Sequence, residues 1–191
     1  MKKIGITGGI AAGKSLVSDI LEEMGYPVFY SDRVAKELIR ISPSLKQQIM
    51  NLLGNQAYLN DKPNTTFIAA TVFGQPELLE KLNAIIHPAV RHAFTEWCKR
   101  QISPIVFNEA AILFETGMYH QYDAVLLVTA PLETRINRAM LRDGSTKEEV
   151  LKRMDRQWPD EDKVSLASYV IINDDQTPVL RQIENFLLTL N

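Results

Sequence analysis

The stretch 6-ITGGIAAGKS-15, near the N-terminus, decides the fold class. Its residues from Gly8 to Ser15 fit the pattern G-x-x-x-x-G-K-[ST], in which a loop of backbone N–H groups and a lysine hold the phosphates of a nucleotide. The glycines allow backbone conformations that bring several N–H groups to one anion, and a helix that starts at Lys14 adds its positive end.

The segments on either side of this loop have the periodicity that the motif requires. Residues 2–7, KKIGIT, are a strand candidate, and residues 14–24 repeat apolar side chains at helical spacing. The simpler alternative is a tight strand-to-helix turn without a ligand, but this context favours nucleotide binding. The residues expected to bind the nucleotide are Gly8, Gly9, Ile10, Ala11, Ala12, Gly13, Lys14, Ser15 and Leu16. Lys14 can reach the outer phosphates, and the Ser15 hydroxyl can ligate Mg²⁺.

The composition is that of an ordinary globular protein, since 46% of the 191 residues are hydrophobic and the formal net charge is -2. There is no basic surplus of the kind that favours nucleic acid or an anionic membrane, so neither partner is expected. The single cysteine, Cys98, excludes an intrachain disulfide, and its apolar surroundings predict a place in the core. The apolar run 124–132 is too short to span a membrane. We therefore expect a cytoplasmic enzyme or switch.

Further strands are predicted where short runs of Val, Ile, Leu and Phe alternate with helical segments. These runs lie within residues 26–32, 103–110, 123–130 and 167–174. Continuous apolar runs are typical of parallel strands that are buried on both faces. The order of elements therefore predicts an α/β protein with a parallel sheet and helical insertions.

Residues 42–100 are predicted to be helical and lie between two strand-rich parts. Pro88 falls inside one of these helices and cannot donate to the helix ladder, so it should kink or split the helix near His87. A histidine at such a break could bind an anionic substrate or satisfy the freed backbone, and both roles stay open.

The segment 131–164 is strongly charged and is predicted to be helical, with a break at Gly144. The sequence STKEEV predicts a capping box after the break, with Ser145 as N-cap and Glu148 as its partner. The arginines of the segment are Arg135, Arg138, Arg142, Arg153 and Arg156. Arginine supplies positive charge that does not titrate, which suits phosphoryl transfer, whereas the alternative is a solvated helix face with ion pairs.

Arg138 and Arg142 are the better candidates for a lid over the phosphates, because they lie one turn apart before the break. Arg135 and Arg156 are expected at the surface. The guanine motifs N-K-x-D and D-x-x-G are absent from the sequence, which argues against a GTP-dependent switch.

Two carboxylates are candidates for the chemistry, because each is predicted at the end of a strand beside the loop. Asp32 could orient or deprotonate a hydroxyl acceptor, or it could simply cap a helix that begins at Arg33. Glu109 could contribute to magnesium binding, or it could be a solvated strand-end residue. We favour the functional role for both.

Taken together, these motifs resemble the dephospho-CoA kinase family. The matching segments follow the family order along nearly the whole chain: ITGGIAAGKS, SDRVAKEL, VFGQPELLEKLNAIIHPAV, EAAILFETG, DAVLLVTAPLETRINRAMLRDGST and VIIND. The resemblance implies a P-loop kinase fold: a core of residues 1–40 and 101–191, with a helical lid at about 138–160. It also implies a helical CoA-binding insert at residues 41–100.

The resemblance further implies roles for individual residues. Asp32 would be the base that acts on the ribose 3′-hydroxyl of dephospho-CoA, while Arg138 and Arg142 would belong to the lid. His87 and Glu115 would lie near the acceptor, and Asn173 would lie next to the adenine of ATP. The expected cofactors are ATP and Mg²⁺, and the expected partner is the small-molecule substrate dephospho-CoA. The sequence leaves the oligomeric state open.

Three segments depart from the family pattern. Tyr30-Ser31-Asp32 replaces Asp-Ala-Asp, so only the second acid is present. Residues 111–115, AILFE, replace Pro-Leu-Leu-Phe-Glu, and Asn64-Thr65 replaces an Asp-Arg pair, which weakens an acceptor contact inferred there. None of these changes affects the phosphate loop or Asp32.

The expected activity is therefore transfer of the γ-phosphoryl group of ATP to the 3′-hydroxyl of dephospho-CoA, the last step of coenzyme A synthesis. The alternatives are another small-molecule or nucleotide kinase, a nucleotide switch without transfer activity, and an α/β domain whose loop binds nothing.

Overall fold

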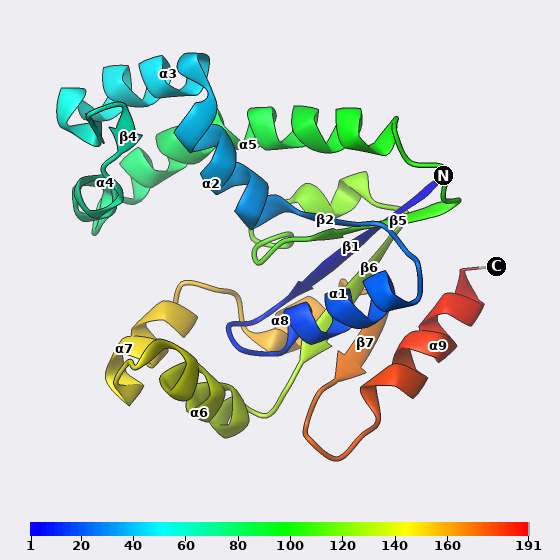
Figure 1. The fold of residues 1–191 in the computed structure, drawn as a ribbon. Helices are drawn as coiled ribbons and strands as arrows, with labels where there is room; N and C mark the ends of the chain where they lie inside the picture. Colours follow the sequence, from blue (N-terminus) through cyan, green and yellow to red (C-terminus); the bar gives the residue numbers. More distant parts are fainter. Residues whose placement is uncertain (191) are drawn as a thin grey trace. The chain divides into compact units, whose positions relative to one another are not determined.

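A sheet of five parallel strands is the centre of one of the two compact units into which the chain divides. The structure is a computed structural model and describes residues 1–190. The strands are β1 (Lys2–Gly8), β2 (Val28–Tyr30), β5 (Ile105–Glu109), β6 (Ala124–Thr129) and β7 (Tyr169–Ile172). Their order across the sheet is β2-β5-β1-β6-β7 (Figure 1). The predicted α/β class with a parallel sheet is confirmed.

The register of the sheet brings the carboxyl ends of the central strands to one edge. Strand β1 lies between β5 and β6, with Ile6 opposite Glu109 and Gly8 opposite Val128. Tyr30, the last residue of β2, also lies opposite Glu109. This edge of an open parallel sheet is where ligands bind, and the loop after β1 starts there.

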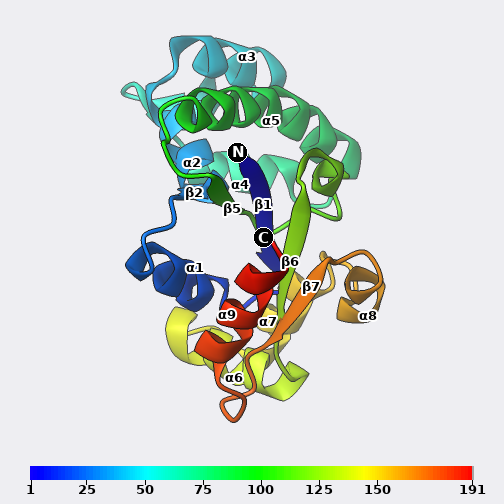
Figure 2. The same cartoon turned by 90° about the vertical axis from the view of Figure 1, so that its right-hand side faces the viewer.

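Helices cover both faces of this sheet because its strands are apolar on both sides. The helices of this unit are α1 (Lys14–Glu23), α6 (Leu132–Asp143), α7 (Lys147–Met154), α8 (Asp160–Val164) and α9 (Val179–Thr189), and η2 (Met118–Gln121) is a 3₁₀ turn. On one face, Leu21 of α1 and Phe186 of α9 are buried with Ile4 and Phe107 of the sheet. Helices α1 and α9 lie side by side there (Figure 2). On the other face, Val125 and Leu127 of β6 are buried against Phe114.

The second unit, residues 31–100, is mostly helical and contains the segment 42–100 that was predicted to be helical. Its elements are α2 (Ser31–Ile41), α3 (Pro43–Leu53), η1 (Asn55–Ala57), β3 (Tyr58–Leu59), β4 (Lys62–Pro63), α4 (Thr65–Val72) and α5 (Pro76–Cys98). The unit starts at Ser31, because α2 packs on α3 and α5, whereas the sequence-based boundary of the CoA-binding insert is residue 41. Cys98 is buried at the end of α5, which confirms its place in a core.

Of the two outcomes predicted at Pro88, a split of the helix is wrong, whereas a kink stays a prediction. Helix α5 continues from Pro76 to Cys98 with Pro88 inside it. The buried residues of α5 recur at helical spacing on both sides of the proline: Leu82, Ile86, Val90, Phe94 and Cys98. Their burial anchors both halves of the helix, and this packing outweighs the one hydrogen bond that proline removes.

The capping box of α7 begins one residue later than predicted. The N-cap is Thr146, whose hydroxyl accepts from the Glu149 N–H at 3.3 Å, and the Glu149 carboxylate accepts from the Thr146 N–H at 2.9 Å. The sequence STKEEV contains two overlapping S/T-x-x-E patterns, and the structure uses the second one instead of Ser145 and Glu148.

Across residues 1–190, no helix combines the length and the apolar character needed to cross a membrane.

Two adjacent leucines of α9 test the packing of the sheet. Leu187 is 9% exposed and lies in the main core, whereas Leu188 is 70% exposed. We expect Leu187→Ala to lower the free energy of unfolding by about 2–5 kcal/mol, since the substitution leaves a cavity. Leu188→Ala, the matched control, should change it by less than about 0.5 kcal/mol. Urea denaturation measures both, and equal effects would contradict this packing.

Candidate functional site

The loop between β1 and α1 presents the positive end of a helix without an acidic side chain to neutralise it. Helix α1 begins at Lys14 after Gly13, which has a φ of 101° and caps the helix without a side-chain hydrogen bond. No acidic residue lies in the first turn of α1. Such a helix start attracts an anion, because its first N–H groups have no partner within the helix.

Lys14 is folded back over the loop. Its Nζ donates to the carbonyl oxygens of Gly8 at 3.0 Å and Gly9 at 3.3 Å. Gly8 has a structural reason to be glycine, because a Cβ there would collide with the Val128 carbonyl oxygen of β6. The absence of a Cβ at Gly8 lets the start of the loop lie against β6. Lys14 lies beside the start of α1, where an anion would bind.

The outer side of the loop is held by Arg135 of α6, a residue expected at the surface. That expectation is wrong: the Arg135 side chain is 9% exposed, and its Nε donates to the Ile10 carbonyl oxygen at 3.1 Å. Its Nη1 lies 2.8 Å from Asp160 Oδ2, which also accepts from the Thr129 hydroxyl at 2.6 Å. A Cβ at Gly9 would collide with this guanidinium, so Gly9 allows the arginine to approach. Arg135 is buried because α6 packs against the loop, and the pattern of charged residues in the sequence does not reveal this packing.

Gln157 completes the contacts around Ile10. Its Oε1 accepts from the Ile10 N–H at 2.9 Å, and its Nε2 donates to the Ala111 carbonyl oxygen at 3.3 Å. The N–H and carbonyl groups of Ile10 are thus held from two different segments. Sequence reasoning missed Gln157, because one glutamine in a charged segment forms no recognisable pattern.

Asn173, a predicted nucleotide-site residue, lies against the loop on another side. It follows β7, is buried, and donates from Nδ2 to the Ala12 carbonyl oxygen at 2.9 Å. Arg138 donates to the Asn173 carbonyl oxygen at 3.1 Å and forms an ion pair with Asp175 at 2.5 Å. The structure therefore brings two predicted site residues, Asn173 and Arg138, together beside the loop.

Arg142 lies at the end of α6 and has a different environment. Its side chain is 61% exposed, and its Nε lies 2.7 Å from Asp143 Oδ1. Arg153 contacts the same carboxylate at 2.9 Å, and the two guanidinium groups hold the pKa of Asp143 well below its usual range. Arg156, as expected, is exposed. The structure thus shows Arg142 in the exposed ion-pair role that the sequence left as an alternative.

Glu115 is engaged in a buried ion pair. The Nζ of Lys163, which is fully buried in α8, lies 2.8 Å from Glu115 Oε1, and the same oxygen accepts from the Trp158 N–H at 3.1 Å. Sequence reasoning missed Lys163, since a lysine in a solvated, charged helix is normally exposed. The pair ties the segment after β5 to α8.

In the second unit, Asp32 lies in the first turn of α2 and is exposed. It does not cap a helix that begins at Arg33, because α2 already begins at Ser31. His87 of α5 is half-buried; burial and the charge of Arg91 lower its pKa, while the charge of Asp32 opposes this shift. Asp32 and His87 are therefore near enough to interact electrostatically.

The two predicted magnesium residues offer hard oxygen ligands. Ser15 is exposed in the first turn of α1, and Glu109 is half-buried at the end of β5. No group of three or more His, Cys, Asp or Glu side chains within residues 1–190 could hold a metal ion. Mg²⁺ usually takes only one or two protein ligands together with substrate phosphates, and a hydroxyl and a carboxylate are ligands of the kind it prefers.

Comparison with known proteins identifies relatives that align with nearly the whole chain. The dephospho-CoA kinase family model matches residues 2–178. The dephospho-CoA kinase of Chlorobaculum tepidum is 42% identical over 199 residues, covering 98% of this chain and 95% of the relative. That of Bacteroides fragilis is 40% identical over 182 residues, covering 95% and 89%. The crystal structure of TT1252 from Thermus thermophilus superposes with a TM-score of 0.86 and 36% identity, covering 99% of this chain and 95% of that one.

The Arg135–Asp160 pair can be tested against an exposed pair on the same helix. Arg135→Ala leaves the Asp160 carboxylate without its cation in a mostly buried place, so we expect a loss of about 3 kcal/mol in the free energy of unfolding. Arg142→Ala breaks an exposed pair and should cost less than about 1 kcal/mol. Chemical denaturation at one pH compares them; similar losses would show that the Arg135 pair contributes no more than a surface pair.

Proposed function

The chain belongs to the dephospho-CoA kinase family, and on this premise we propose that it transfers the γ-phosphoryl group of ATP to the ribose 3′-hydroxyl of dephospho-CoA. The observation that carries the proposal is the phosphate loop, whose backbone is held by Arg135, Gln157 and Asn173 and whose lysine lies over it. Relatives named dephospho-CoA kinase align with nearly the whole chain, which supports dephospho-CoA as the acceptor.

In the proposed reaction, the 3′-oxygen of the acceptor forms a bond to the γ-phosphorus of ATP. The bond from that phosphorus to the β–γ bridging oxygen breaks, and ADP leaves with the bridging oxygen. The hydroxyl proton passes to the carboxylate of Asp32, which is exposed. Lys14 compensates the charge that spreads over the phosphoryl oxygens during transfer.

The arginines of α6 have two roles in this proposal. Arg138, held by Asn173 and Asp175, adds positive charge beside the loop. To bind the phosphates of ATP, Arg142 would have to leave its ion pair with Asp143. Because this pair is exposed, breaking it costs little free energy.

The acceptor side of the proposal rests on His87 and Glu115. We assign His87, which is near enough to Asp32 to feel its charge, to direct contact with the acceptor. The Glu115 carboxylate already holds Lys163 and the Trp158 N–H, so we assign it to shaping the segment after β5 rather than to direct contact.

Mg²⁺ would be held by Ser15 and Glu109 together with the phosphates of ATP, and when bound it neutralises charge on the β- and γ-phosphates. We also propose a cytoplasmic location and no nucleic-acid partner. The single buried cysteine suits a reducing compartment, and the net charge of -2 offers no general attraction to nucleic acid.

A direct assay tests the activity. Purified protein with ATP, Mg²⁺ and dephospho-CoA should produce equal amounts of CoA and ADP, measured by chromatography and mass spectrometry. Removal of Mg²⁺ with a chelator should abolish the product, and added Mg²⁺ should restore it. Phosphorylation of a nucleoside or nucleotide without CoA formation would reject the acceptor, and ADP formation without any phosphorylated acceptor would reject the transferase.

Asp32→Asn tests the proposed base. The variant should lower kcat by about 10²–10⁴-fold, because the amide cannot accept the proton, while the KM for ATP stays nearly unchanged. Asp19→Asn, which changes an exposed aspartate of α1, is the matched control and should retain full activity. Full activity of Asp32→Asn would remove Asp32 as the base.

A further inference from the structure

Ala11, in the phosphate loop, has a backbone conformation that an alanine rarely adopts. Its φ is 58°, in the left-handed region. Within residues 1–190, the other non-glycine residues with a positive φ are Asn60, Asp61 and Asp175. Asparagine and aspartate tolerate this region because their short polar side chains can form hydrogen bonds with the nearby backbone. Alanine has no such group, so the conformation of Ala11 has to be stabilised by its surroundings.

This conformation belongs to a tight turn of residues 9–12. The Ala12 N–H donates to the Gly9 carbonyl oxygen at 3.2 Å, which closes the turn and places Ala11 at its third position. Turns with a positive φ at the third position normally have glycine or asparagine there. The local sequence therefore does not favour the turn that the loop adopts.

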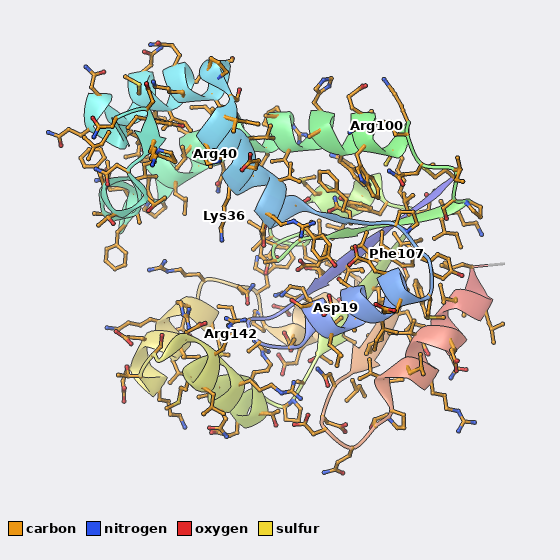
Figure 3. All side chains as sticks on the ribbon, viewed as in Figure 1. Asp19, Lys36, Arg40, Arg100, Phe107 and Arg142 are labelled. Carbon is orange, nitrogen blue, oxygen red and sulfur yellow. The ribbon has the colours of Figure 1, made fainter. Side chains whose placement is uncertain are left out.

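Two separate cores hold adjacent side chains of this turn. The Ala12 side chain is fully buried in the main core of the sheet. Helices α6 and α7 form a hairpin, with Arg142 in the last turn of α6 (Figure 3). The buried residues between these helices, here called the hairpin cluster, are Ile136, Ala139 and Val150. Ile10 and Ala11 pack against the hairpin cluster, so the chain has to turn sharply between Ala11 and Ala12.

The turn leaves the N–H group of Ala11 available to a ligand. The Ile10 N–H donates to Gln157, and the Ala12 N–H is used within the turn. The Ala11 N–H has no acceptor within residues 1–190. It can therefore donate to a phosphate oxygen, as the N–H groups of such loops do. Relaxation of Ala11 to a negative φ would rotate the adjoining peptide groups and misplace this donor.

We propose that Ala11 is a positioning residue through which the α6–α7 hairpin presets the phosphate loop for ATP. The hairpin cluster holds the methyl group of Ala11, the methyl group holds the left-handed turn, and the turn keeps the N–H in place. Glycine would adopt the same turn without strain, but it has no methyl group for the hairpin to hold, and a flexible loop loses entropy when it binds. The inference deepens the proposed function and rests only on its ATP-binding part.

A double-mutant cycle between the loop and the hairpin tests the proposal. Ala11→Gly removes the methyl group, and Val150→Ala removes atoms from the hairpin cluster. We expect each to raise the Kd for ATP by about 5-fold, as measured by calorimetry with Mg²⁺ and without acceptor. The double variant should also remain at about 5-fold, because Val150 acts on the loop through the methyl group that Ala11→Gly has already removed. Independent effects would multiply to about 25-fold.

Two control variants separate positioning from stability. Val125→Ala removes the same atoms from the separate core on the other face of the sheet, so it should lower the Tm while changing the Kd for ATP by less than about twofold. Leu141→Ala alters a side chain of α6 that is 87% exposed, and it should change neither quantity. Ile136→Val, a milder change in the hairpin cluster, should weaken ATP binding in the same direction as Val150→Ala but by less.

Three results would overturn the inference while the wild type binds ATP. These are unchanged or tighter ATP binding by Ala11→Gly, a double variant at about 25-fold, and a loss of ATP affinity in Val125→Ala equal to that in Val150→Ala. Each of them leaves the proposed function standing, because wild-type ATP binding is measured in the same series. If the wild type binds no ATP, the proposed function fails first and the inference fails with it.

Discussion

The rest of the site depends on the backbone of a short loop that is held from outside by polar side chains. The N–H and carbonyl groups of Ile10 contact Gln157 and Arg135, and the carbonyl group of Ala12 contacts Asn173. A loop that presents several N–H groups to an anion has to be held in place before the anion arrives, because a flexible loop would lose entropy on binding. The contacting side chains also require small residues, and Gly9 and Gly13 leave the space that Arg135 and Asn173 occupy.

These contacts join the phosphate loop to three segments of the same unit that are distant in the sequence. Arg135 belongs to α6, Gln157 lies between α7 and α8, and Asn173 follows β7. The ion pair between Glu115 and Lys163 ties α8 to the segment after β5. A displacement of α6 would therefore change the contacts that hold the loop, so the position of α6 and anion binding at the loop should be energetically coupled.

Much of the fold followed from local patterns in the sequence. The apolar strands, the phosphate loop and the helical block of residues 42–100 were predicted because hydrophobic periodicity and glycine spacing are local properties. The errors occurred where neighbouring patterns compete or where packing overrides a local preference. Thr146 rather than Ser145 caps α7, and α5 passes through Pro88 because buried side chains anchor it on both sides.

The sequence by itself determined the nucleotide loop, the parallel α/β class and the family, since these depend on residues close together in the chain and on motifs in a fixed order. Only the tertiary structure decided which polar side chains hold that loop. Arg135, Gln157 and Asn173 are separated from their loop partners by 125, 147 and 161 residues along the chain. The physical reason is that burial and hydrogen-bond partners are fixed when the sheet brings distant segments together, and no local pattern distinguishes a buried arginine or lysine from a solvated one.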